Sequence, residues 1–150
     1  MKKIELVYEI FIRTTPEKLW AAITKPVFTR QYWGGRDNVS DWKKGSKWQH
    51  VDSEDNGAVG VEGTVVESVP PKRLVLTWAD PENPKDVSRV SFDIEQLDDM
   101  VGLKVVHGGF KAKSDMPGRV SWGWPRVLSS LKSFLETGKG FKLPCKPRGD

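Results

Sequence analysis

The stretch WPRVLSSLKSFLETG, residues 124–138, decides the fold. Its apolar residues are spaced three and four positions apart, which places them on one face of an α-helix. Gly138 predicts the end of this helix, and Pro125 predicts either a start at about residues 121–124 or a kink there. The apolar face comprises Trp124, Val127, Leu128, Leu131, Phe134 and Leu135. The chain therefore ends in one long amphipathic helix that must lie against another apolar surface.

The residues before this helix supply that surface, because most of them alternate between apolar and polar side chains. A period of two is typical of β-strands with one buried face. Strands are predicted over residues 4–13, 47–53, 60–69, 73–79, 87–97 and 101–109. Asp55-Asn56-Gly57 predicts a hairpin turn, whereas the residues that follow Gly34-Gly35 are expected to be irregular.

Two short helices are predicted directly after the first strand. Thr15 is a helix N-cap and Pro16 occupies the first helical position, where the missing N–H is tolerated. Lys25-Pro26 ends this helix, and Pro26 begins a second one that runs through Tyr32.

Together these elements predict an α+β helix-grip fold: a curved antiparallel sheet of about six or seven strands around the long C-terminal helix. A sheet with one apolar face must cover it, and only the final helix is long enough. We expect a ligand cavity between the sheet and this helix. The domain is expected to span residues 1–138, followed by a basic, mobile tail over residues 139–150.

Several fragments, in order along the chain, resemble the activator-of-heat-shock-protein-ninety-ATPase-like (AHSA-like) family of the START / birch-pollen-allergen-like (SRPBCC) superfamily. The longest is FIRTTPEKLWAAITKP, residues 11–26, in which a strand leads into a Pro-Glu-x-Leu-Trp helix. The others are Gln31-Tyr32-Trp33-Gly34, Gly63-Thr64-Val65-Val66-Glu67, Pro70-Pro71-Lys72-Arg73-Leu74, Thr77-Trp78, His107-Gly108-Gly109-Phe110, and Gly123-Trp124 with Leu128, Leu131 and Lys132. The resemblance covers roughly residues 4–138. It implies the helix-grip fold and a cavity, but no single function, since relatives bind lipids, polyketides or hormones, act as aromatases or cyclases, or stimulate a chaperone ATPase.

Seven tryptophans along the chain are its most unusual compositional feature. These rings could form a stacking surface for a flat ligand, or they could simply fill the core. The aromatic set considered for this role is Trp33, Trp48, Trp78, Phe92, Trp122 and Trp124. The residues expected to line a ligand site are Trp33, Trp48, Val65, Leu76, Trp78, Val90, Phe92, Val105, His107, Trp124 and Leu128.

His107 and Glu67 are the candidates for catalysis. His107 shares a strand face with Leu103 and Val105, so it could contact a ligand or transfer protons; alternatively, neighbouring groups satisfy it. Strict alternation puts Glu67 on the apolar face of its strand, where its pKa would rise as in a general base. The alternative is that a bulge turns Glu67 outward, or that it pairs with Arg73.

Composition excludes several other classes of protein. The formal net charge is +4, of which the tail carries +3 because it holds Lys139, Lys142, Lys146 and Arg148 against Asp150, so no basic stripe for nucleic acid is expected. No apolar run is long enough to span a membrane, and Glu5 and Glu9 interrupt any signal peptide.

One cysteine excludes a disulfide framework, and with two histidines we expect no metal site. Phosphate-binding glycine loops are absent, so no cofactor is expected. We infer a cytoplasmic location.

Three functions stay open at this stage. The first is binding of a small hydrophobic, aromatic or lipid-like molecule between the sheet and the helix. The second is a cyclase-type or aromatase-type enzyme acting on such a ligand, with Glu67 and His107 as an acid–base pair. The third is a co-chaperone-like interaction module, which the length of the chain disfavours because a separate chaperone-docking domain has no room. The sequence favours binding over catalysis.

Overall fold

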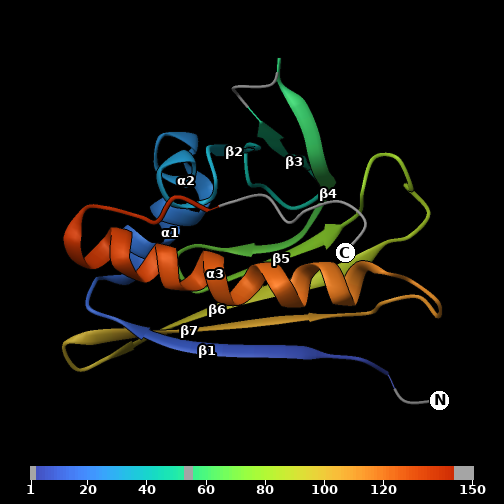
Figure 1. Cartoon of the computed structure of the whole chain (residues 1–150). Helices are drawn as coiled ribbons and strands as arrows, with labels where there is room; N and C mark the ends of the chain where they lie inside the picture. The colour runs from blue at the N-terminus through green and yellow to red at the C-terminus, as the bar shows by residue number, and fades with distance from the viewer. Residues whose placement is uncertain (1–2, 53–55, 144–150) are drawn as a thin grey trace.

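Seven strands form one antiparallel sheet with the order β1-β7-β6-β5-β4-β3-β2. The computed structural model describes residues 3–52 and 56–143. In chain order the elements are β1 (Leu6–Ile12), α1 (Pro16–Thr24), α2 (Pro26–Tyr32), β2 (Arg36–Val39), β3 (Lys47–Asp52), β4 (Ala58–Val69), β5 (Arg73–Trp78), β6 (Ser88–Leu97), β7 (Met100–Gly108) and α3 (Met116–Thr137). The sheet curls, and α3 lies along one of its faces (Figure 1). The predicted helix-grip fold is confirmed.

The two helices after β1 begin where the sequence predicts them. The Thr15 hydroxyl accepts a hydrogen bond from the Lys18 backbone N–H at 3.2 Å, which caps α1. Pro16 and Pro26 each occupy the first turn of a helix, where no backbone N–H is required. As a result, α1 and α2 form a short pair at one end of the sheet (Figure 1).

The prediction of an irregular stretch after Gly34-Gly35 is wrong. Residues 36–39 form the edge strand β2, which pairs with β3 in antiparallel register, for example Asn38 opposite His50. The sequence RDNV carries no apolar alternation, and the one buried residue in it is the polar Asn38. Three polar residues and one valine at a sheet edge give too little periodicity for a strand to be recognised.

The C-terminal helix also begins earlier than predicted. It starts at Met116, with Pro117 in its first turn and the Ser114 hydroxyl accepting the Met116 backbone N–H at 3.0 Å. Pro125 lies inside the helix and has no N–H to donate to the carbonyl of Ser121, four residues earlier. Both residues are exposed, so this carbonyl can accept a hydrogen bond from water. Gly138 ends the helix with a left-handed φ of 86°, as predicted.

The core forms where α3 meets the concave face of the sheet. One row of side chains crosses four strands through the register pairs Val65–Leu76, Leu76–Val90 and Val90–His107. All four residues in this row are at most 3% exposed. The helix covers them with a buried face that includes Trp124, Val127, Leu128 and Leu131. Among residues 3–52 and 56–143, no helix combines the length and hydropathy that crossing a membrane requires.

The first residues of the predicted tail pack against the domain. The Phe141 backbone N–H donates to the buried Ser130 hydroxyl at 2.7 Å. A Cβ atom on Gly140 would lie 2.5 Å from the backbone oxygen of Gln31, so this segment runs directly against α2. Leu143 packs against the core as well. The described part of the expected tail, residues 139–143, therefore contacts the rest of the domain, while residues 144–150 lie outside the described residues.

Candidate functional site

A connected group of aromatic rings occupies the space between α3 and the sheet. Trp78 lies at its centre, with its ring centroid 5.5 Å from that of Trp48, 5.5 Å from Trp124 and 5.2 Å from His107. Trp124 is also 5.7 Å from Trp33 and 5.9 Å from Phe92. These distances are those of rings in direct contact. We call the six residues Trp33, Trp48, Trp78, Phe92, His107 and Trp124 the aromatic cluster.

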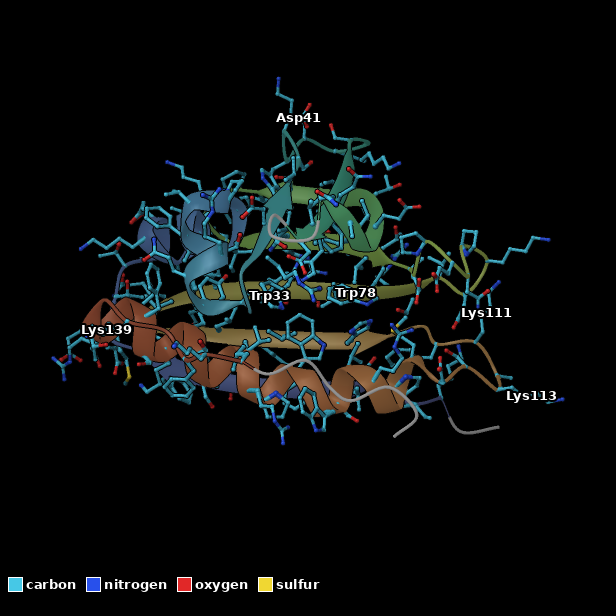
Figure 2. The ribbon with its side chains drawn as sticks, turned by 45° about the horizontal axis from the view of Figure 1, so that its top comes forward. Trp33, Asp41, Trp78, Lys111, Lys113 and Lys139 are labelled. Atoms are coloured by element: carbon cyan, nitrogen blue, oxygen red, sulfur yellow. The ribbon has the colours of Figure 1, made fainter. Side chains whose placement is uncertain are left out.

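The members of the aromatic cluster range from fully buried to partly exposed. Trp48, Trp78 and Trp124 are at most 6% exposed, whereas Trp33 is only partly buried. Trp33 follows directly after α2, and Figure 2 shows it and Trp78 near the middle of the molecule, away from the charged side chains at the periphery. Trp33 is therefore the member of the cluster that joins the interior to the outside.

His107 is completely buried in the cluster, and both of its ring nitrogens have partners. The Trp124 indole N–H donates to Nδ1 at 3.0 Å, so Nδ1 carries no proton. Nε2 therefore holds the proton and donates to the Ser88 hydroxyl at 2.8 Å, which in turn donates to the Trp78 carbonyl at 3.3 Å. These hydrogen bonds satisfy the imidazole within the protein and leave His107 no free nitrogen for a ligand or for proton transfer.

Burial lowers the pKa of His107 from 6.5 to about 4. The folded protein therefore takes up this proton only well below neutral pH, whereas the unfolded chain takes it up near pH 6.5. Neutral His107 thus contributes stability that is fully present above pH 6.5 and is lost as the pH falls from 6.5 towards 4.

The variant His107→Gln tests this assignment. Between pH 7 and pH 5 the wild-type protein should lose about 2 kcal/mol of unfolding free energy through His107. In the variant this part of the pH dependence should vanish, whatever the stability of the variant at pH 7. Urea unfolding at pH 7 and pH 5 gives the loss of unfolding free energy in each protein. The same pH dependence in both proteins would contradict a neutral, buried His107.

His50 is the second buried histidine, at 5% exposure. Its Nδ1 lies 2.6 Å from Oδ1 of Asn38 on the neighbouring strand β2, and its ring centroid is 4.9 Å from that of Trp33. Burial, followed by the positive charge of Arg36, lowers the pKa of His50 to about 3, although Asp52 opposes this change. A neutral imidazole therefore borders the partly open end of the aromatic cluster.

Glu67 does not face the apolar interior; the structure shows the alternative placement, in which Glu67 pairs with Arg73. The β4–β5 register shifts between Val65 and Glu67, and this irregularity breaks the strict alternation on which the inward placement depends. The Glu67 carboxylate instead accepts a hydrogen bond from Nε of Arg73 at 3.2 Å, with 46% of the Glu67 side chain exposed. Arg73 also contacts Asp93 at 2.6 Å, which makes this a surface ion-pair network across three strands.

The structure brings the other predicted site residues together in one core. Those that are buried there are Trp48, Val65, Leu76, Trp78, Val90, Phe92, Val105, His107, Trp124 and Leu128, and Trp33 packs against them. Two polar residues that orient the histidines, Ser88 and Asn38, were not predicted from the sequence. Each is separated from its histidine by a dozen residues or more, and no local pattern marks it.

Comparison with protein families settles the relationship that the fragments indicated. Residues 13–136, more than half of the chain, match the family described as Activator of Hsp90 ATPase homolog 1-like protein. The chain belongs to this family. The matched region runs from the end of β1 to the end of α3 and so includes the whole aromatic cluster. Among curated proteins, none matches the chain.

Solved structures of similar proteins show the same fold. The Aha1 dimer from Colwellia psychrerythraea is 24% identical, with a TM-score of 0.74 over 91% of this chain and 99% of that one. MLL2253 from Mesorhizobium loti is 27% identical, with a TM-score of 0.72 over 88% and 96%. CalU16 from Micromonospora echinospora is 19% identical, with a TM-score of 0.72 over 93% and 78%. Each is similar in fold along most of this chain.

Proposed function

We propose that this protein binds a small hydrophobic molecule with a planar aromatic part, and that the ligand enters between the sheet and α3 beside Trp33. The observation that carries the proposal is the continuity of the aromatic cluster. Trp33, which is partly exposed, contacts both Trp124 and His50, and Trp124 continues to Trp78. A continuous series of ring contacts thus leads from a partly exposed tryptophan into the interior. Helix-grip architecture and family membership support the same location.

The affinity of such a site comes from burial of apolar area, at about 25 cal/mol per Å². Offset or edge-on contacts with indole rings add about 0.5–1.5 kcal/mol for each ring pair. Binding is favoured over catalysis because the two candidate catalytic groups do not form a pair. His107 has both nitrogens occupied, and Glu67 is bound to Arg73 at the surface. An acid–base reaction needs free groups within hydrogen-bond reach of the ligand.

Titration with 2-naphthol, flavone and oleate tests the proposal. We expect the aromatic compounds to change tryptophan emission and to raise the melting temperature, since a ligand at 100 times its Kd stabilises the folded state by about 2.7 kcal/mol. Trp33→Leu should weaken binding by up to about tenfold, because it removes one aromatic contact with the ligand. Trp20→Leu is the matched control, because Trp20 is also partly buried but lies on α1 and is not a member of the aromatic cluster. If no compound alters the emission or the melting temperature, the proposal is wrong.

A further inference from the structure

The two buried histidines differ in how many ring nitrogens the protein satisfies. His107 uses both, through Trp124 and Ser88. His50 has a partner for Nδ1 only, the Oδ1 atom of Asn38 at 2.6 Å. Among residues 3–52 and 56–143, no hydrogen-bond partner for Nε2 of His50 is found. Although His50 as a residue is only 5% exposed, Nε2 itself is not sealed off, so water can reach this nitrogen when no ligand is present.

The orientation of Asn38 determines which nitrogen of His50 carries the proton. The Asn38 side-chain amide donates to the backbone oxygen of Ile23 at 3.2 Å, and its backbone N–H donates to the Thr29 hydroxyl at 3.0 Å. The amide nitrogen therefore points to Ile23, and Oδ1 points to His50 as an acceptor. It follows that Nδ1 of His50 is the donor, and that Nε2 keeps an unshared electron pair.

A ligand that covers Nε2 displaces water from it, and an acceptor that is buried in this way without a donor costs about 1–3 kcal/mol. His50 is well placed for a ligand, because its ring contacts Trp33 at the open end of the aromatic cluster. Arg36 and Asp52 flank the histidine, with Nε of Arg36 3.4 Å from Oδ2 of Asp52. With its pKa at about 3, His50 is too weak a base to remove a proton near neutral pH, but it can accept a hydrogen bond.

We propose that Nε2 of His50 accepts a hydrogen bond from a hydroxyl group on the aromatic ligand, so that the protein selects phenols over their methyl ethers. This inference rests on the proposed function and adds the chemical class of the ligand. A site built to hydrogen-bond a hydroxyl discriminates against an analogue that lacks it, because the buried acceptor is then left unpaired. A purely apolar site would prefer the ether, which has one more carbon to bury.

The test compares 2-naphthol with 2-methoxynaphthalene in the wild type and in two variants. We expect the wild type to bind 2-naphthol about tenfold more tightly. His50→Asn keeps a donor to Asn38 but has no atom at the Nε2 position, so the preference should disappear. His50→Gln is the matched control, because its amide oxygen reaches that position and should keep much of the preference. Fluorescence titration gives the ratio of the two dissociation constants in each protein.

A second measurement keeps the inference testable if either variant fails to fold. In wild-type protein with ¹⁵N-labelled histidine, 2-naphthol should shift the Nε2 resonance of His50 towards that of a hydrogen-bonded nitrogen, and the ether should not. Equal affinities for the two probes, or a preference that survives in His50→Asn, would overturn this inference and leave the proposed function intact. Failure of both probes to bind the wild type would overturn both.

Discussion

Replacing Trp124 by alanine should lower the free energy of unfolding by about 3–5 kcal/mol and the melting temperature by on the order of 10 °C. Trp124 is 3% exposed and contacts Trp33, Trp78 and Phe92 with its ring. Removing the indole leaves a cavity between α3 and the sheet. It also removes the N–H that donates to Nδ1 of His107, so a fully buried acceptor loses its partner.

Trp122→Ala is the matched control on the same helix. Trp122 is partly buried and lies beneath the guanidinium of Arg126, 4.1 Å from the ring centroid, but it is not a member of the core. Its loss should cost about 1 kcal/mol or less. Urea unfolding of both variants measures the difference. If the two substitutions destabilise the protein equally, the aromatic cluster is not the centre of the core.

Trp124→Phe separates the ring from its hydrogen bond. Phenylalanine keeps an aromatic ring in the core but has no N–H, so His107 loses one partner while much of the packing remains. The expected cost is about 1–3 kcal/mol, below that of alanine.

The sequence predicts those parts of the molecule that local rules determine. Thr15 and Pro16 mark the start of α1, and Gly138 marks the end of α3, because capping and turn geometry depend on a few adjacent residues. The apolar face of α3 is likewise a local pattern. Consequently the fold class, the order of the elements other than β2, and the inward position of Trp48, Trp78 and Trp124 could be predicted, whereas Trp122 lies outside the core.

Features that depend on contacts between distant residues could not be predicted in the same way. Alternation alone predicted Glu67 on the inner face, but the shift in register against β5 places it at the surface. The register between two strands cannot be predicted from the sequence of either strand alone. For the same reason the sequence singled out His107, and not His50, as the histidine that could contact a ligand. His107 is satisfied by Ser88 and Trp124, whereas His50 has a free acceptor because Asn38, on a strand too short to recognise, orients it.

A substitution in β4 should be as damaging as the loss of Trp124, although it adds only one carbon. Gly63 lies opposite Trp48 in the β3–β4 register. A Cβ atom at Gly63 would lie 2.0 Å from the backbone oxygen of Thr77 and 2.6 Å from its carbonyl carbon. Neither backbone atom can rotate away as the end of a flexible side chain would. Gly63→Ala must therefore push β4 and β5 apart.

Moving Thr77 would break two further interactions. Its carbonyl accepts the indole N–H of Trp48 at 2.8 Å, and its hydroxyl accepts the Thr64 backbone N–H at 2.8 Å. Trp48 is 1% exposed, so its N–H would find no replacement in water. We expect Gly63→Ala to cost about 3 kcal/mol or more, at or above the upper end of the usual range for overpacking.

Gly123→Ala is the control for Gly63→Ala, since no atom lies within 4 Å of a Cβ built there and the residue is helical. Alanine at that position should stabilise the protein by about 0.5–1 kcal/mol, because it restricts the unfolded chain. Urea unfolding gives both values, and near-ultraviolet circular dichroism should report disturbed indole packing in Gly63→Ala alone. Equal stability of the two variants would mean that the close approach of β4 to Thr77 does not hold Trp48 in the aromatic cluster.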